Sequence, residues 1–126
     1  MQAQIVEDLL ETPKAELQIA IGLGAREICA VYAERLNVPN PTIIAAKVLH
    51  GYWRRIMPGP LIVTPQMMVS KNFHAKLSGK LLIVDYYPFS RRQMSEVYRL
   101  MQTHERYVMR ITSHINQIRV VPHSVP

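Results

Sequence analysis

Five of the six arginines in the last third of the chain have a spacing that suits contact with a polyanion. Arg106 and Arg110 stand one helical turn apart, so a helix would project both from one face. Guanidinium groups donate hydrogen bonds to phosphate oxygens and paired hydrogen bonds to guanine edges. We therefore expect Arg106 and Arg110 at the base edges of duplex DNA. Arg91, Arg92 and Arg99 are expected nearer phosphates.

Three further polar side chains belong to the same expected surface. His104, Glu105 and His114 would share the outer face of a helix that begins after Thr103. A glutamate can accept a hydrogen bond from the amino group of cytosine. We expect Glu105, together with His104, to add contacts to bases.

A pair of helices must position these residues. Ser90 and Gln93 fit a capping box, which predicts a helix beginning at Arg91. The apolar spacing then breaks, and Thr103 can cap a second helix. In a helix-turn-helix the second helix enters the major groove. Residues 89–120 are therefore predicted to be a helix-turn-helix that binds DNA.

Helices are also predicted in the first half of the chain. Thr12 followed by Pro13 is a strong helix start, and apolar residues at three- and four-residue spacing continue to Leu36. A second amphipathic series occupies residues 43–55. Residues 61–64, LIVT, are a short β-type run between prolines.

Together these elements predict a mainly α-helical chain with one or two short β-strands. Residues 1–65 form a helical dimerisation region, residues 66–88 a connector, and residues 121–126 a loose tail after the helix-turn-helix. Residues 81–87, LLIVDYY, have strand composition but could equally be a buried helical turn.

The charge is divided unevenly along the chain. Residues 1–63 hold six basic and six acidic side chains, whereas residues 64–126 hold nine basic and three acidic ones. Clustered lysine and arginine neutralise phosphates and release counterions. The neutral half therefore suits assembly and the basic half suits a polyanion, although a solubilising face fits the charge alone equally well.

The residue types that build metal sites and catalytic sites are sparse. Cys29 is the only cysteine, which excludes a disulfide within one chain and fits a reducing cytoplasm. The five histidines lack the spacing of a zinc site, and no serine or histidine motif supports nucleophilic catalysis. We expect no metal, no cofactor and no enzymatic activity. The histidines are His50, His74, His104, His114 and His123.

No membrane segment is expected. The N-terminal residues MQAQIVEDLLE carry acid where a secretory signal carries base, and no apolar stretch approaches the length that spans a bilayer. The sequence therefore predicts a cytoplasmic protein.

Residues 89–97, FSRRQMSEV, followed by residues 107–109, YVM, resemble the Mor/C family of transcription activators (middle operon regulator) of Mu-like phages. The family has a phenylalanine, a polar-basic step, an apolar-acidic helix start, a turn, and a second helix with a central Val-Tyr-like pair. Residues 58–65, PGPLIVTP, look like the family's glycine-containing turn and short strand. The resemblance covers about residues 15–118 and implies a homodimer that binds an inverted repeat and contacts RNA polymerase.

The sequence thus leads to two hypotheses for function. The first is a dimeric, sequence-specific regulator of transcription that binds double-stranded DNA. The second is a non-enzymatic helical adaptor whose basic face binds an acidic protein or RNA. Duplex affinity that falls steeply with salt yet keeps a sequence preference would favour the first.

Overall fold

Helices and strands alternate along the part of the chain that the computed structural model describes, which is residues 2–20, 22–70, 79–114 and 116–125. In chain order they are α1 (Gln2–Glu11), β1 (Lys14–Ile19), α2 (Ala25–Arg35), β2 (Thr42–Ile44), the short 3-10 helix η1 (Lys47–Leu49), α3 (His50–Ile56), β3 (Leu61–Val63), α4 (Pro65–Met68), β4 (Gly79–Asp85), α5 (Arg91–Thr103), β5 (His104–Thr112) and β6 (Ile118–Pro122).

The strands form one mixed sheet in the order β3-β2-β4-β5-β1-β6. Strands β1 to β5 are parallel to one another. The edge strand β6 pairs antiparallel with β1. The prediction of a mainly helical chain with one or two short strands is therefore wrong. The described residues form an α/β fold with a six-stranded sheet at its centre.

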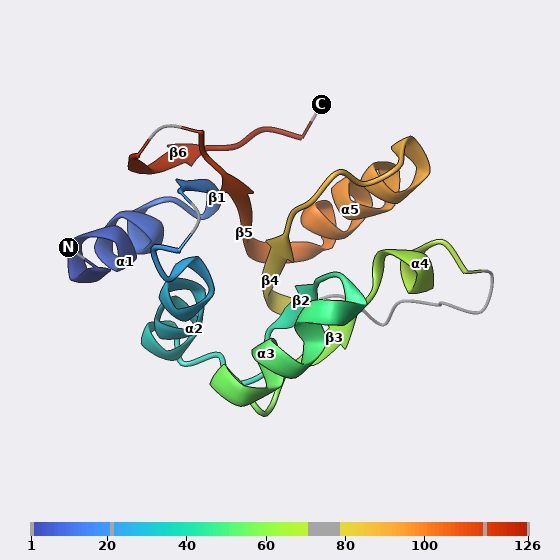
Figure 1. The fold of residues 1–126 in the computed structure, drawn as a ribbon, viewed down its shortest axis with the longest axis horizontal. Coiled ribbons are helices and arrows are strands. Elements are labelled where there is room, and N and C mark those ends of the chain that lie inside the picture. Colours follow the sequence, from blue (N-terminus) through green and yellow to red (C-terminus); the bar gives the residue numbers. More distant parts are fainter. Residues whose placement is uncertain (1, 21, 71–78, 115, 126) are drawn as a thin grey trace.

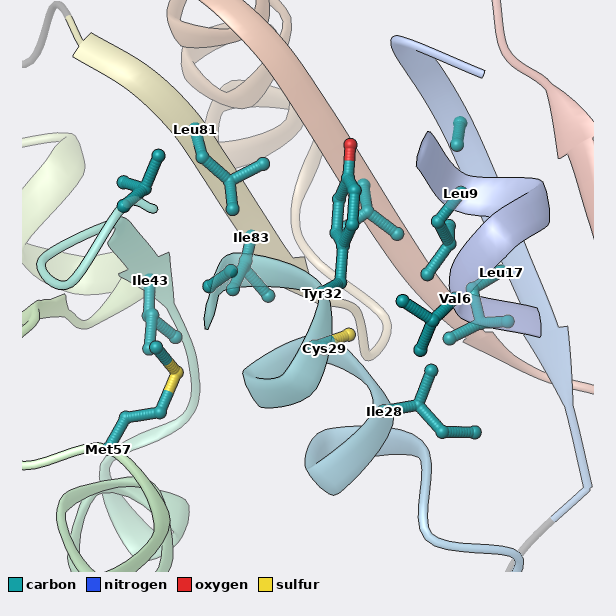
Figure 2. Packing of buried hydrophobic residues seen from close by; sticks show 14 of the residues in the cluster. Val6, Leu9, Leu17, Ile28, Cys29, Tyr32, Ile43, Met57, Leu81 and Ile83 are labelled. Carbon is teal, nitrogen blue, oxygen red and sulfur yellow. The ribbon is translucent and has the colours of Figure 1, made fainter. Parts of the chain in front are cut away.

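Helices cover both faces of this sheet (Figure 1). α1, α2 and α3 lie on one side and share a core with residues of β1, β2, β4 and β5. α4 and α5 lie on the other side and form a second core. Figure 2 shows Ile28, Cys29 and Tyr32 of α2 pointing toward the sheet, where they pack with residues such as Leu17 and Ile83. Burial on both faces explains the continuous apolar run from Leu81 to Val84 in β4 and from Tyr107 to Met109 in β5.

The long helix predicted from Pro13 to Leu36 is wrong, because this stretch holds β1, a turn and α2. In β1, alternate residues from Ala15 to Ile19 are buried, which is the period of a strand. The Thr12 hydroxyl donates to the Asp8 carbonyl, so it closes α1 and caps no new helix. The turn between β1 and α2 contains Gly22 and Gly24, both with positive φ values.

The amphipathic helix predicted for residues 43–55 is correct only in its second part. Ile43 and Ile44 belong to β2 and enter the cores on opposite faces of the sheet. The α-helix begins at His50. The short strand predicted at residues 61–64 is confirmed as β3. Of residues 81–87, the first five belong to strand β4, which ends at Asp85.

The helix-turn-helix predicted for residues 89–120 is wrong, although its first helix is confirmed. In α5 the Ser90 hydroxyl accepts from the Gln93 N–H at 3.1 Å, and the Gln93 side chain accepts from the Ser90 N–H at 2.9 Å. From His104 onward the chain is a central strand, whose Tyr107 and Met109 face α5 while Val108 faces the opposite core.

Two other parts of the predicted organisation have a simple structural outcome. Residues 71–78 of the predicted connector lie outside the described residues. Val121 and Pro122, at the start of the predicted loose tail, belong to β6. The next residue is also held, because the His123 N–H donates to the Lys14 carbonyl at 2.8 Å.

Candidate functional site

The parallel strands end together at one edge of the sheet, and this edge holds a group of buried charges. After β1 the chain enters α2 on one face, whereas after β4 it enters α5 on the opposite face. In open α/β sheets, ligands bind outside the carboxyl ends of strands where successive connections diverge to opposite faces. The ends of β1, β4 and β5 are therefore where this fold is expected to bind a ligand.

Asp85, the last residue of β4, is the centre of the group. Its side chain is 0% exposed, and it is contacted from three different elements. Arg26 of α2 donates from Nε at 2.7 Å, Trp53 of α3 from Nε1 at 2.9 Å, and Arg110 of β5 from Nε at 2.5 Å. We call these four residues the Asp85 cluster. It joins two helices and two strands through one carboxylate.

The two arginines of the Asp85 cluster differ in how many donors they have left. Arg110 also donates from Nη1 to the Thr112 hydroxyl at 2.9 Å and from Nη2 to the Tyr86 carbonyl at 2.6 Å, so each guanidinium nitrogen is bound. Arg26 directs Nε and Nη2 at Asp85, and among the described residues its Nη1 has no partner. Arg26 is also the more exposed, at 26% of its side chain against 10% for Arg110.

A cavity of about 480 Å³ opens beside these arginines. This volume is within the range of sites for small molecules. The lining combines the end of β1, the turn into α2, and the carboxyl end of β5. Its residues are Ile19, Ala20, Gly22, Gly24, Ala25, Arg26, Glu27, Tyr52, Arg110 and Thr112.

The turn into α2 brings backbone close to the cavity. Gly22 and Gly24 have φ values of 85° and 75°, a backbone conformation that residues with a Cβ rarely adopt. Gly24 is the N-cap of α2 and has no side chain to bind the first helical N–H groups. Such N–H groups, together with the helix dipole, favour an anion.

The glycine pattern is only part of known phosphate-binding patterns. Residues 22–27, GLGARE, have the first two glycines of the dinucleotide fingerprint G-x-G-x-x-G, but Glu27 replaces the third. The stretch also lacks the lysine of the pattern G-x-x-x-x-G-K-[ST]. It is therefore the cavity and the arginines, rather than a sequence motif, that define this site.

Tyr52 of α3 lies beside the arginines at the cavity. Its ring centre is 5.7 Å from the guanidinium carbon of Arg26 and 5.5 Å from that of Arg55. Contacts of this kind hold a guanidinium by attraction to the ring face. Arg26 is thus bound by Asp85 and flanked by Tyr52, and both Arg26 and Tyr52 line the cavity.

Cys29 lies behind this site and is chemically quiet. It is fully buried, and burial, followed by the negative charge of Asp85, raises the pKa of its thiol to about 12. A neutral buried thiol is neither a nucleophile nor a metal ligand. Among the residues that the structure describes, no group of three His, Cys, Asp or Glu side chains could hold a metal ion.

The structure disperses the residues that the sequence placed on one DNA-binding surface. Arg91, Arg92 and Arg99 are exposed on α5, and Glu105 and His114 are exposed elsewhere. These five do not share a helix.

The other three predicted residues have internal partners. Arg110 belongs to the Asp85 cluster. Arg106 donates from Nη2 to the Leu10 carbonyl at 2.5 Å, and so binds the last turn of α1. His104 is buried, with Nδ1 2.7 Å from the Leu100 carbonyl, and burial lowers its pKa. In this conformation none of the three is free to read bases.

Sequence reasoning missed Asp85 and Arg26 as site residues. A signal for Asp85 was present, since an acid directly after four apolar strand residues stands where the carboxyl edge of a buried sheet would be. Trp53 is fully buried. Its hydrogen bond to Asp85 joins residues 32 apart in sequence, which spacing alone could not reveal.

The fold and the cavity thus define an α/β domain with a polar pocket at the carboxyl edge of its sheet. Comparison with protein-family models and with curated proteins found no match. No helix in the described ranges has both the length and the apolar character that crossing a membrane requires.

Proposed function

We propose that this domain binds a small phosphate-bearing molecule of nucleotide size in the cavity at the carboxyl edge of the sheet. The proposal rests on Arg26, which lines the cavity and is held by Asp85, while its Nη1 has no partner among the described residues. A preoriented guanidinium binds phosphate strongly because little side-chain freedom is lost on binding.

The surroundings of Arg26 support an anion. The Asp85 cluster contains two guanidinium groups and one carboxylate, so one positive charge remains within the cluster after they pair, beside the negative charge of Glu27 in the same lining. The uncapped first turn of α2 adds backbone donors. Glu27 lies in the same lining and can accept hydrogen bonds from a sugar or a base. The proposed role is binding, in keeping with the expectation that the chain is not an enzyme.

Calorimetric titration of the full chain with pyrophosphate, ATP and adenosine tests the proposal. We expect pyrophosphate and ATP to bind and adenosine not to bind. Ala20→Asp adds a negative charge to the cavity without removing a member of the Asp85 cluster, and it should weaken both ligands by about tenfold or more. Arg26→Gln should do the same.

Arg35→Gln is the matched control. Arg35 is on the same helix as Arg26, but it forms a solvent-exposed ion pair with Glu7 and does not line the cavity. Unfolding curves of all variants show whether each is folded. Equal pyrophosphate affinity for Arg26→Gln and Arg35→Gln, or adenosine binding as tight as ATP, would contradict the proposal.

A second candidate function remains the binding of duplex DNA, now on the outer side of α5. We infer it from Arg91, Arg92 and Arg99, which are exposed on this helix in a chain of net charge +6. Arg91→Ala/Arg92→Ala should weaken duplex binding and reduce its salt dependence. If the unmodified chain does not bind duplexes at moderate salt, this basic face is left for an acidic protein or RNA.

A further inference from the structure

A second cavity, whose lining is more apolar than that of the cavity at the carboxyl edge, lies between α2 and the end of α3. Its volume is about 730 Å³. Most of its lining is apolar, including Val31, which is 41% exposed on α2. We call it the α2–α3 groove. Its residues are Glu27, Ala30, Val31, Glu34, Asn37, Val38, Pro39, Ile56, Met57 and Pro58.

The charge of the α2–α3 groove is opposite to that of the chain. The chain has a net charge of +6, yet the groove is lined by two glutamates and by no lysine or arginine. Among the described residues neither Glu27 nor Glu34 forms an ion pair. These two carboxylates therefore attract a cation to the groove, although the net charge of the chain is positive.

The spacing of the groove residues is that of one helix face. Glu27 and Glu34 are seven residues apart on α2, which is two turns or about 10.5 Å along the axis. Val31 lies between them, four residues after Glu27, and so shares their face. Ile56 and Pro58 provide the opposite apolar wall. The arrangement is an apolar strip with a carboxylate toward each end.

We propose that the α2–α3 groove binds a basic amphipathic helix of a partner protein. The apolar side of that helix would cover Val31 and Ile56, and cations two turns apart would meet Glu27 and Glu34. A second copy of this chain offers no such helix among its described residues. Its basic amphipathic helix is α5, whose apolar residues Val97, Leu100 and Met101 are already buried against the sheet.

Fluorescence anisotropy with a labelled 18-residue helical peptide of leucine and lysine tests this inference on the full chain. We expect the peptide to bind, and Val31→Asn/Glu34→Lys to weaken binding by about tenfold or more. Glu96→Lys is the matched control, since it makes the same charge change on α5, across the sheet, and should leave affinity unchanged. A peptide with glutamate in place of lysine should not bind.

The inference is overturned if the leucine-lysine peptide does not bind, or if Glu96→Lys weakens binding as much as the groove variant does. It is equally overturned if the glutamate peptide binds as well as the lysine peptide. Neither Val31 nor Glu34 lines the carboxyl-edge cavity. Loss of peptide binding with retained pyrophosphate binding therefore separates this inference from the proposed function.

Discussion

The Asp85 carboxylate accepts hydrogen bonds from Arg26, Trp53 and Arg110. These donors come from α2, α3 and β5, and the Asp85 side chain has no exposed surface. A buried charge is tolerated when it is paired and hydrogen-bonded, and it becomes costly when one partner is removed. Asp85 is therefore a structural residue for the sheet edge as well as the residue that orients Arg26.

Asp85→Asn should lower the free energy of unfolding by about 3–5 kcal/mol, because Arg110 is left buried without a counter-charge. Urea denaturation measures the loss. Glu96→Gln is the comparison, since the pair between Glu96 and Arg99 is solvent-exposed and contributes less than about 1 kcal/mol. Equal losses for the two variants would mean that the Asp85 cluster is not the charged group that stabilises this edge.

His104 makes stability depend on pH. Its Nδ1 contacts the Leu100 carbonyl, while Nε2 is buried and has no partner among the described residues. A proton on Nε2 would therefore be buried unpaired, and the pKa of His104 falls below its ordinary value of 6.5. Below pH 6.5 the unfolded chain binds this proton more readily than the folded chain.

The free energy of unfolding should therefore decrease as the pH falls below 6.5, with the His104 part of that slope at most about 1.4 kcal/mol per pH unit. His104→Gln should reduce the slope in this window, whereas His114→Gln, at an exposed position, should leave it unchanged. Denaturation at a series of pH values provides the comparison. An unchanged slope in His104→Gln would show that another group is responsible.

At the scale of elements, local signals were sufficient for α5 and for the short strand β3 but insufficient for the other strands. The capping box of Ser90 and Gln93 acts within four residues, so it was readable from the sequence. Strand β5 is buried on both faces and is therefore apolar at Tyr107, Val108 and Met109 in succession. A continuous apolar run does not show whether its period is that of a strand or a helix.

The turn at Gly22 and Gly24 is a second case in which apolar spacing alone did not give the correct element. Gly22 and Gly24 interrupted an apolar spacing that otherwise matched a helix, and their positive φ values mark the true boundary before α2. Residues 14–19 form a strand because β1 pairs with β5. This pairing joins Leu17 to Arg110 across more than ninety residues. The alternation within β1 is local, but spacing along the chain does not show which strand it pairs with, so neither the strand order nor the site that it forms was predictable.

At the scale of the whole molecule, the neutral and basic halves of the sequence are interleaved. In the sheet order β3-β2-β4-β5-β1-β6, strands β1, β2 and β3 come from residues 1–65 and the others from residues 66–126. β4 lies against β2, and β5 lies against β1. The uneven charge therefore does not divide the fold into an assembly part and a separate basic part.

This interleaving predicts that residues 66–126 do not fold alone. β6 would lose its partner β1, β5 would keep only β4, and the core beneath α1, α2 and α3 would be missing. Circular dichroism of that fragment in increasing urea should show no cooperative transition, while the full chain shows one. A cooperative transition in the fragment would mean that the basic half is an independent domain. In that case the Asp85 cluster, which takes Arg26 and Trp53 from the other half, could not be what holds β4 and β5 in place.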